Sequence, residues 1–160
     1  MVREVLRYPH PLLKQVCSPA DREEAARVSQ DLLDTMRSFP GCVGLAAPQI
    51  GEPVRVAVVD VSEHPRAETS NGLLLLVNPR VELSEGSVVA REGCLSIPDL
   101  TANVRRATTI HVRAVDVFAE CHGFEARCVL HELDHLDGLL FLDRVQSIAS
   151  DVFLRKVYKQ

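Results

Sequence analysis

The residues with the clearest chemical potential form a His-Glu-x-x-His motif: His131, Glu132 and His135. On an α-helix, residues four apart leave the same face, so the two imidazoles can bind one divalent metal ion. Glu132 points away from that pair but can still reach a water molecule at the metal. Two nitrogen ligands and a proton acceptor on one helix indicate metal-assisted hydrolysis.

The surrounding residues favour a buried helix over a chance pentapeptide. Asp134 and the two histidines would then need partners, because an unpaired buried polar group is costly, and a metal ion supplies one for the histidines. The apolar residues that recur in helical steps are Leu130, Leu133, Leu136, Leu139 and Leu140.

A third protein ligand is expected, since a catalytic site of this kind usually has three plus a water molecule. No glutamate follows Glu132, and position 141 is Phe141 rather than histidine, so two common zinc-peptidase patterns do not fit. The remaining candidates are Asp143, Asp151 or an upstream cysteine or histidine.

Two cysteines compete for that place. Cys128 lies three residues before His131 on the same helical face, but three ligands from one helix form an almost linear row that suits a tetrahedral site poorly. Cys94 follows a glycine at the expected end of a strand, and a ligand from a distant loop closes the geometry better. Each thiol alone also fits an ordinary buried side chain.

Composition indicates one globular domain, which we expect to span residues 1–160. The net charge is −4 with no basic block, which argues against nucleic-acid binding, and no apolar run is long enough for a membrane span. Five cysteines without scaffold-like spacing, and no export signal, favour reduced thiols and a cytoplasmic location.

The expected elements are short. Residues 1–20 contain three prolines and should be extended or turn-like. Asp21 and Glu24 indicate a capped helix to about Ser38. Short connections favour antiparallel pairing of the strands. Strands are predicted for residues 54–61, 73–77, 81–90 (around Gly86) and 108–117. A turn at 120–123, a metal-binding helix from Phe124 and a closing helix at 147–158 complete the prediction.

Gln49 is the polar residue in a run of small and apolar side chains at residues 42–51. Small residues permit close backbone approach, and the Gln49 amide can donate to a substrate oxygen. Taken alone, an ordinary loop glutamine is the simpler interpretation.

Three separated blocks carry a family resemblance: residues 44–49 (GLAAPQ), 92–96 (EGCLS) and 131–138 (HELDHLDG). Their order and spacing resemble the peptide deformylase family over nearly the whole chain. The resemblance implies an α+β fold, with antiparallel β-sheets packed around a central helix that carries the metal ligands, and with an N-terminal and a C-terminal helix.

The resemblance implies that Cys94, His131 and His135 bind the metal, with water as the fourth ligand. Glu132 would take a proton from that water and return it to the departing amine. The metal would be one divalent ion, natively Fe(II), with Zn, Ni or Co as possible occupants.

Four further residues gain roles from the resemblance. Gln49 and the backbone N–H of Leu95 would stabilise the oxyanion. Gly44 would let the substrate backbone lie close, and Val43 would line a pocket for a methionine side chain.

The implied reaction removes the formyl group from the N-terminal formylmethionine of newly made proteins and releases formate. The implied partners are N-formylmethionyl nascent peptides and the ribosome near its exit tunnel. A zinc endopeptidase and a catalytically silent binding protein on the same scaffold are the alternatives.

Two residues depart from the family pattern. Cys42 stands where the first glycine of the first block is usual, and Leu130 stands where a glutamine usually precedes the first histidine. We expect these changes to adjust backbone approach and metal affinity without abolishing activity.

Overall fold

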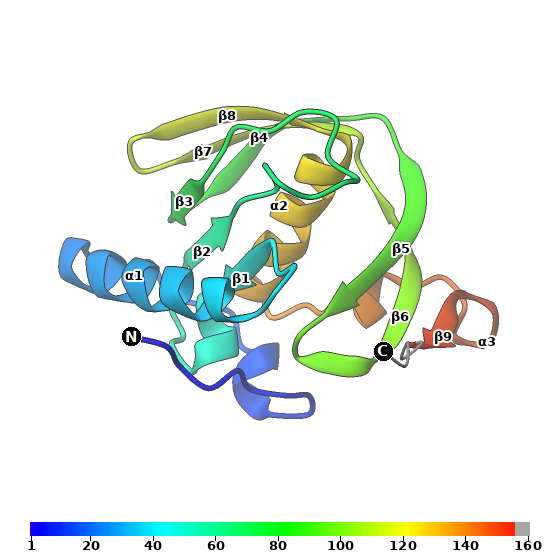
Figure 1. Ribbon diagram of the computed structural model, residues 1–160, viewed down its shortest axis with the longest axis horizontal. Coiled ribbons are helices and arrows are strands. Elements are labelled where there is room, and N and C mark those ends of the chain that lie inside the picture. The colour runs from blue at the N-terminus through cyan, green and yellow to red at the C-terminus, as the bar shows by residue number, and fades with distance from the viewer. Residues whose placement is uncertain (156–160) are drawn as a thin grey trace.

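A computed structural model describes residues 1–155 as an α+β fold in which three antiparallel sheets surround one central helix (Figure 1). The sheet orders are β1-β2-β3, β4-β7-β8 and β5-β6-β9. The α-helices are α1 (Arg22–Ser38), α2 (Gly123–Leu136) and α3 (Ile148–Asp151), and the 3-10 helices are η1 (Pro11–Lys14), η2 (Ala47–Ile50) and η3 (Phe141–Arg144). The strands are β1 (Gly44–Ala46), β2 (Val56–Val59), β3 (Leu74–Val77), β4 (Arg80–Glu85), β5 (Val88–Cys94), β6 (Ile97–Arg106), β7 (Thr109–Ala114), β8 (Val117–His122) and β9 (Val152–Leu154).

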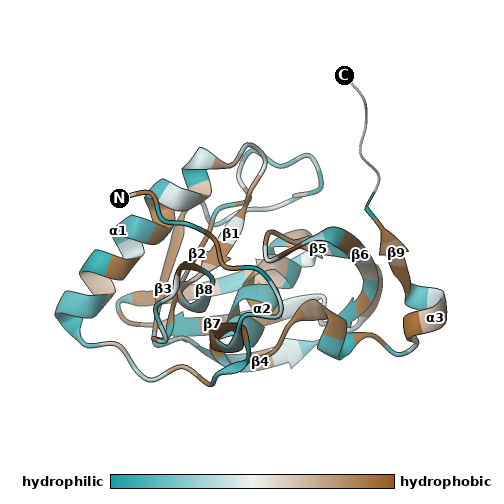
Figure 2. Ribbon diagram, turned by 90° about the horizontal axis from the view of Figure 1, so that it is seen from below, coloured by the Kyte–Doolittle hydropathy of each residue, from teal (hydrophilic) through white to brown (hydrophobic). Residues whose placement is uncertain are grey.

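Helix α1 begins and ends as the sequence predicts. Asp21 caps it, and the reciprocal bonds of Asp21 with Glu24 form a capping box. Hydrophilic and hydrophobic residues alternate along the helix, as Figure 2 shows. Its apolar face covers the β1-β2-β3 sheet through Val28, Leu32 and Met36, so α1 forms the outer layer of this part of the molecule.

Strand β2 is buried on both of its faces. Val56 and Val58 belong to the cluster under α1, whereas Ala57 and Val59 belong to the cluster around α2. Side chains of a strand alternate between faces, so a strand between two helical layers needs an unbroken apolar run. This explains why the predicted strand at residues 54–61 shows no polar alternation.

Helix α2 lies at the centre of the fold, and neighbouring elements cover both its apolar face and its polar face. Val129, Leu133 and Leu136 pack against the first two sheets, and Figure 1 shows the β5-β6 sheet on another side of the helix. The His-Glu-x-x-His residues lie within this helix and are buried.

The expected strand at residues 81–90 is wrong in one respect: it is two strands. Gly86 has a φ of +73° between them, and β4 pairs with β7 while β5 pairs with β6. A left-handed glycine breaks the strand, and each half then pairs in a different sheet.

The turn expected at residues 120–123 is also wrong. The reversal lies between β7 and β8, where Asp116 adopts a φ of +58°, and β8 continues to His122 before α2 starts. Aspartate tolerates the left-handed conformation, so this residue was the stronger turn signal.

The two ends of the chain need correction as well. Residues 11–14 form a 3-10 turn, with proline at its start, within the segment predicted to be extended. The closing helix has one turn, α3, after which Val152 and Phe153 enter β9 beside β6. Valine and phenylalanine favour strands when an open sheet edge is available. The predicted helix beyond residue 155 lies outside the described residues.

Within residues 1–155, every helix is too short or too polar to serve as a transmembrane span.

We expect Gly138→Ala to destabilise the fold. Gly138 has a φ of +75°, and an added Cβ would lie 2.7 Å from the backbone oxygen of Lys14. Left-handed strain and the steric clash together should lower the free energy of unfolding by roughly 2–5 kcal/mol. Urea denaturation measures this loss.

Gly51→Ala is the matched control for this experiment. Gly51 has a φ of +85° with no neighbouring atom within 4 Å of an added Cβ, so only the strain of about 1–2 kcal/mol should remain. Equal losses in the two variants would contradict a role for the contact with Lys14.

Candidate metal centre

Three side chains from two distant parts of the chain meet at the inner side of α2. Cys94 Sγ and one ring nitrogen each from His131 and His135 all lie within 4.8 Å of one another, and all three residues are buried. Cys94 Sγ is 3.4 Å from His135 Nε2. Within residues 1–155 no other group of three metal-ligating side chains has this geometry, and Cys128 is not part of it.

The end of β5 positions the sulfur. The register of β5 against β6 shifts between Gly93 and Cys94, and a two-residue turn follows before β6 begins at Ile97. A bulge bends a strand and redirects a side chain. The bulge therefore lies immediately before the residue whose thiol meets the histidines.

His131 is oriented by Glu92. The His131 Nδ1 atom lies 2.8 Å from Glu92 Oε1, which leaves Nε2 as the nitrogen available to a metal. A carboxylate that holds the far nitrogen of a histidine fixes both the tautomer and the ring orientation.

Two arginines neutralise Glu92 in the interior. Arg106 donates to both of its carboxylate oxygens at 2.8 Å and 3.0 Å, and Arg127 donates to Oε2 at 2.6 Å. Burial raises the pKa of Glu92, but hydrogen bonds from His131 and Arg106 outweigh burial and hold the pKa well below its usual value. Glu92 is therefore a buried carboxylate.

Asp134 extends the same ionic network. Arg106 Nη1 donates to Asp134 Oδ2 at 2.6 Å, and Arg144 donates to both oxygens of this aspartate. Asp134 lies on α2, one residue before His135, so the network also holds the C-terminal turn of the metal helix.

The donor set fits a divalent transition metal. One thiol and two imidazoles form a borderline-soft set that suits Zn, Fe, Ni or Co and does not suit Mg or Ca. Two buried polar atoms beside the site, Glu132 Oε1 and His135 Nδ1, have no hydrogen-bond partner among the described residues. The thiol and imidazole donors are already close together, so a small ion can satisfy all three without a large rearrangement.

Glu132 is a buried carboxylate between the site and β1. Burial raises its pKa to about 7. Gly44 lies directly against it: a Cβ built on Gly44 would be 2.6 Å from Glu132 Oε2. A glycine at this position thus leaves room for the carboxylate, a constraint that the sequence did not reveal.

Gln49 holds its amide beside the sulfur. Its Oε1 accepts from the backbone N–H of Ala46 at 3.0 Å, and its Nε2 donates to Ser96 Oγ at 3.1 Å and lies 3.5 Å from Cys94 Sγ. Its side chain is almost fully buried, so the amide has one fixed orientation with the N–H groups directed to the site.

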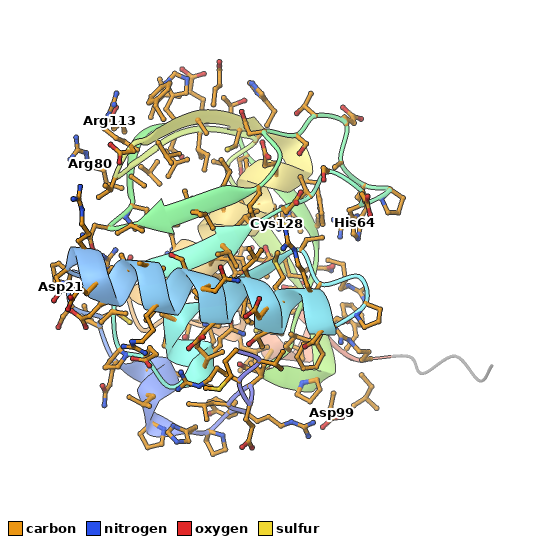
Figure 3. The ribbon with its side chains drawn as sticks, turned by 60° about the vertical axis from the view of Figure 1, so that its left-hand side comes forward. Asp21, His64, Arg80, Asp99, Arg113 and Cys128 are labelled. Carbon is orange, nitrogen blue, oxygen red and sulfur yellow. The ribbon has the colours of Figure 1, made fainter. Side chains whose placement is uncertain are left out.

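A cleft of about 320 Å³ opens at the metal centre. Val43, Gly44 and Leu95, the predicted substrate residues and oxyanion donor, line it, as do Gln49 and Glu132. Cys42 and Cys128 line it too; Figure 3 labels Cys128 and His64, another lining residue. Of the predicted site residues, all but His135 therefore line one cavity, and His135 lies against Cys94, which lines it.

The arginines of the network were missed by the sequence analysis. Arg127 carried a usable signal, because it precedes His131 by four residues and so shares its face of α2. Arg106 and Arg144 carried none, since their approach to α2 depends on long-range packing.

Comparison with known proteins identifies the family. The family model described as "Polypeptide deformylase" matches residues 2–151. The peptide deformylase of Rhizobium meliloti is 39% identical over 99% of this chain and 93% of its own length. That of Mesorhizobium japonicum is 36% identical over 99% and 92%. The chain belongs to the polypeptide deformylase family.

Solved structures agree with this assignment. A peptide deformylase from Thermotoga maritima superposes with a TM-score of 0.80 at 31% identity, covering 92% of this chain and 99% of that one. A Met-Ala-Ser-bound class I type b peptide deformylase from Acinetobacter baumannii gives 0.81 at 30% identity, covering 90% and 99%. The predicted α+β fold is confirmed.

The activity follows from family membership. The protein is a hydrolase that removes the N-formyl group from nascent peptides, and the family is one of metalloenzymes. The prediction of a peptide deformylase is therefore confirmed, whereas the roles of individual residues require the proposal below.

We expect Glu92→Gln to weaken metal binding by about 10–100-fold, the usual cost of losing a partner that orients a metal-binding histidine. Glutamine has the shape of glutamate but lacks the negative charge to which His131, Arg106 and Arg127 bind. Competition with a chelator measures the zinc affinity.

Glu125→Gln is the control, because Glu125 is equally buried but bonds to Asn71 outside the network. Equal zinc affinities in the Glu92 variant and the unmodified protein would contradict the orienting role.

Proposed function

We propose that Cys94, His131 and His135 bind one divalent metal ion with which the protein hydrolyses N-formylmethionyl peptides to formate and a free amine. The observation that carries this proposal is the convergence of one sulfur and two ring nitrogens, with Glu132 beside them, at the head of a cleft. We further propose that residues 1–160 form one catalytic domain.

When bound, the ion lowers the pKa of a water molecule towards neutrality and polarises the formyl carbonyl. Glu132 accepts the proton that this water loses as its oxygen forms a bond to the formyl carbon. When the carbon–nitrogen bond breaks, Glu132 returns that proton to the amine. Its burial and its missing Oε1 partner leave the carboxylate available for both transfers.

Gln49 and the backbone N–H of Leu95 stabilise the negative charge that develops on the formyl oxygen. Fixed donors act best where little reorganisation is needed, and Gln49 is held by Ala46 and Ser96. Leu95 lies in the tight turn after Cys94, so its backbone is carried by the same β5–β6 hairpin as the sulfur.

The substrate lies along β1. This strand pairs on one side only, with β2, and Gly44 at its start lines the cleft. A glycine permits close approach of the peptide backbone. Val43 beside it contributes apolar surface for the methionine side chain.

Fe(II) is the proposed native metal, and Zn, Ni or Co are alternative occupants of the same donor set. Nascent formylmethionyl peptides are the proposed substrates, and the cytoplasm near the ribosomal exit tunnel is the proposed location.

Release of formate from a formyl-Met peptide, with metal analysis of the same sample, tests the proposal. One equivalent of divalent metal and stoichiometric formate and free amine are expected. A metal-loaded sample that cleaves casein but releases no formate would instead identify an endopeptidase.

We expect Cys94→Ser to weaken metal binding far more than Cys128→Ser. The first substitution removes the sulfur that lies within 4.8 Å of both histidine donors, whereas Cys128 lies outside that group. Metal content after dialysis against a chelator measures the difference. The opposite ranking would transfer the ligand role to Cys128.

We expect Glu132→Ala to retain the metal and lose turnover by at least about 10²-fold, since a positioned proton carrier contributes 10²–10⁴-fold. Initial rates of formate release and metal content are measured together. Normal turnover in this variant would exclude Glu132 as the proton acceptor.

We expect Gly44→Ala to fold and bind metal but to lower turnover by roughly 10²-fold, the scale of a 1 Å displacement in an active site. The added methyl group overlaps Glu132 Oε2, and the carboxylate can rotate away from it. Thermal unfolding serves as the control, and a large loss of stability with normal turnover would contradict this account.

A further inference from the structure

The cleft has a cationic rim formed by Arg66, Arg91 and Arg155. All three side chains are exposed. They come from three parts of the chain: the segment between β2 and β3, strand β5, and the residue after β9. The protein as a whole has a net charge of −4, which makes this local excess of positive charge a distinct feature.

The rim arginines are held without carboxylate partners. Arg66 stacks on Phe124 at 4.7 Å and donates to the backbone oxygen of Arg91 at 3.3 Å. Arg91 stacks on Phe153 at 3.8 Å and donates to the neutral side chains of Asn103 and Thr101. Stacking fixes the guanidinium planes and leaves their charges uncompensated.

The Arg155 side chain packs on Gly93, where a Cβ would collide with the guanidinium. No ion pair among the described residues involves Arg66, Arg91 or Arg155, in contrast to Arg106 and Arg144 of the buried network.

No exposed acid offsets this charge inside the cleft. Among the described residues that line it, the carboxylates are Glu92 and Glu132, and both are buried. Glu92 is paired with Arg106 and Arg127. Outside the cleft, Asp60 and Glu63 line an adjoining groove that shares residues 41–43 and His64 with it. The exposed Asp99 accepts a hydrogen bond from the backbone N–H of Arg155 through its backbone oxygen, and its side chain does not line the cleft.

Resting on the function proposed above, we propose that the rim selects formylated peptides that carry an acidic side chain shortly after the formylmethionine. The reacting end of the peptide must enter at the metal centre, so the residues that follow it pass Arg66 and Arg91 at the rim of the cleft. A carboxylate there can form charge-assisted hydrogen bonds with guanidinium groups that are already oriented.

The position of the arginines favours a peptide over RNA as the ligand. They line the same recess as Cys94, His131 and Glu132, where the substrate peptide is held. An RNA-binding surface needs positive charge spread along an accessible face, and the chain's overall charge is acidic.

The test compares kcat/KM of the metal-loaded protein for three amidated peptides: formyl-Met-Ala-Asp-Ala, formyl-Met-Ala-Asn-Ala and formyl-Met-Ala-Lys-Ala. A second set of three peptides carries the aspartate, asparagine or lysine one position later. We expect the aspartate peptide to exceed the lysine peptide by about fivefold to tenfold, the effect of one to two exposed charge pairs. Added salt should reduce the ratio.

Arg66→Gln combined with Arg91→Gln should bring the ratio close to one, by slowing the aspartate peptide and speeding the lysine peptide. Arg80→Gln combined with Arg113→Gln changes the net charge equally on the β4-β7-β8 sheet, away from the cleft (Figure 3), and should leave the ratio unchanged.

Equal rates for the aspartate and lysine peptides, with normal turnover of the asparagine peptide, would overturn the inference and leave the proposed function intact. Failure to deformylate the asparagine peptide would overturn the proposed function itself. Loss of ribosome co-sedimentation in the Arg66 and Arg91 variant, with the peptide ratio retained, would assign the rim to RNA and overturn the inference.

Discussion

The buried carboxylate of Glu92 is the interaction on which the site depends. Glu92 lies two residues before Cys94 on β5, and it bonds to His131 and Arg127 of α2 and to Arg106 of β6. It therefore joins the hairpin that carries the sulfur to the helix that carries the imidazoles. A buried charge without a partner is strongly destabilising, so the network holds the two elements in one arrangement.

Around this connection, the layers leave one region open. Strand β2 is covered by α1 and α2, and the β4-β7-β8 sheet covers α2 from another side. Strands β1 and β5 each pair on one side only, and residues of both line the cleft. The packing thus buries Cys94, His131 and His135 while it leaves access between two unpaired strand edges.

Close packing explains why small residues surround the chemistry. Gly44 makes room for the Glu132 carboxylate, and Gly138 passes against the backbone of Lys14 directly after α2. Both glycines matter because they lack a side chain, so the position of the Glu132 carboxylate and of the end of α2 depends on the space that they leave.

Helical spacing in the sequence determined that His131 and His135 share one face, and the capping residues determined where α1 starts. Both depend on neighbours in the chain. The order of the three motifs indicated the family. Tertiary structure decided what depends on distant partners: the split at Gly86 into strands of two sheets, and the change from the closing helix to strand β9 at Val152. It also decided which of two cysteines lies beside the histidines. Spacing alone left Cys94 and Cys128 open, because helical periodicity describes one element, whereas only the packed β5–β6 hairpin places a sulfur beside both imidazoles.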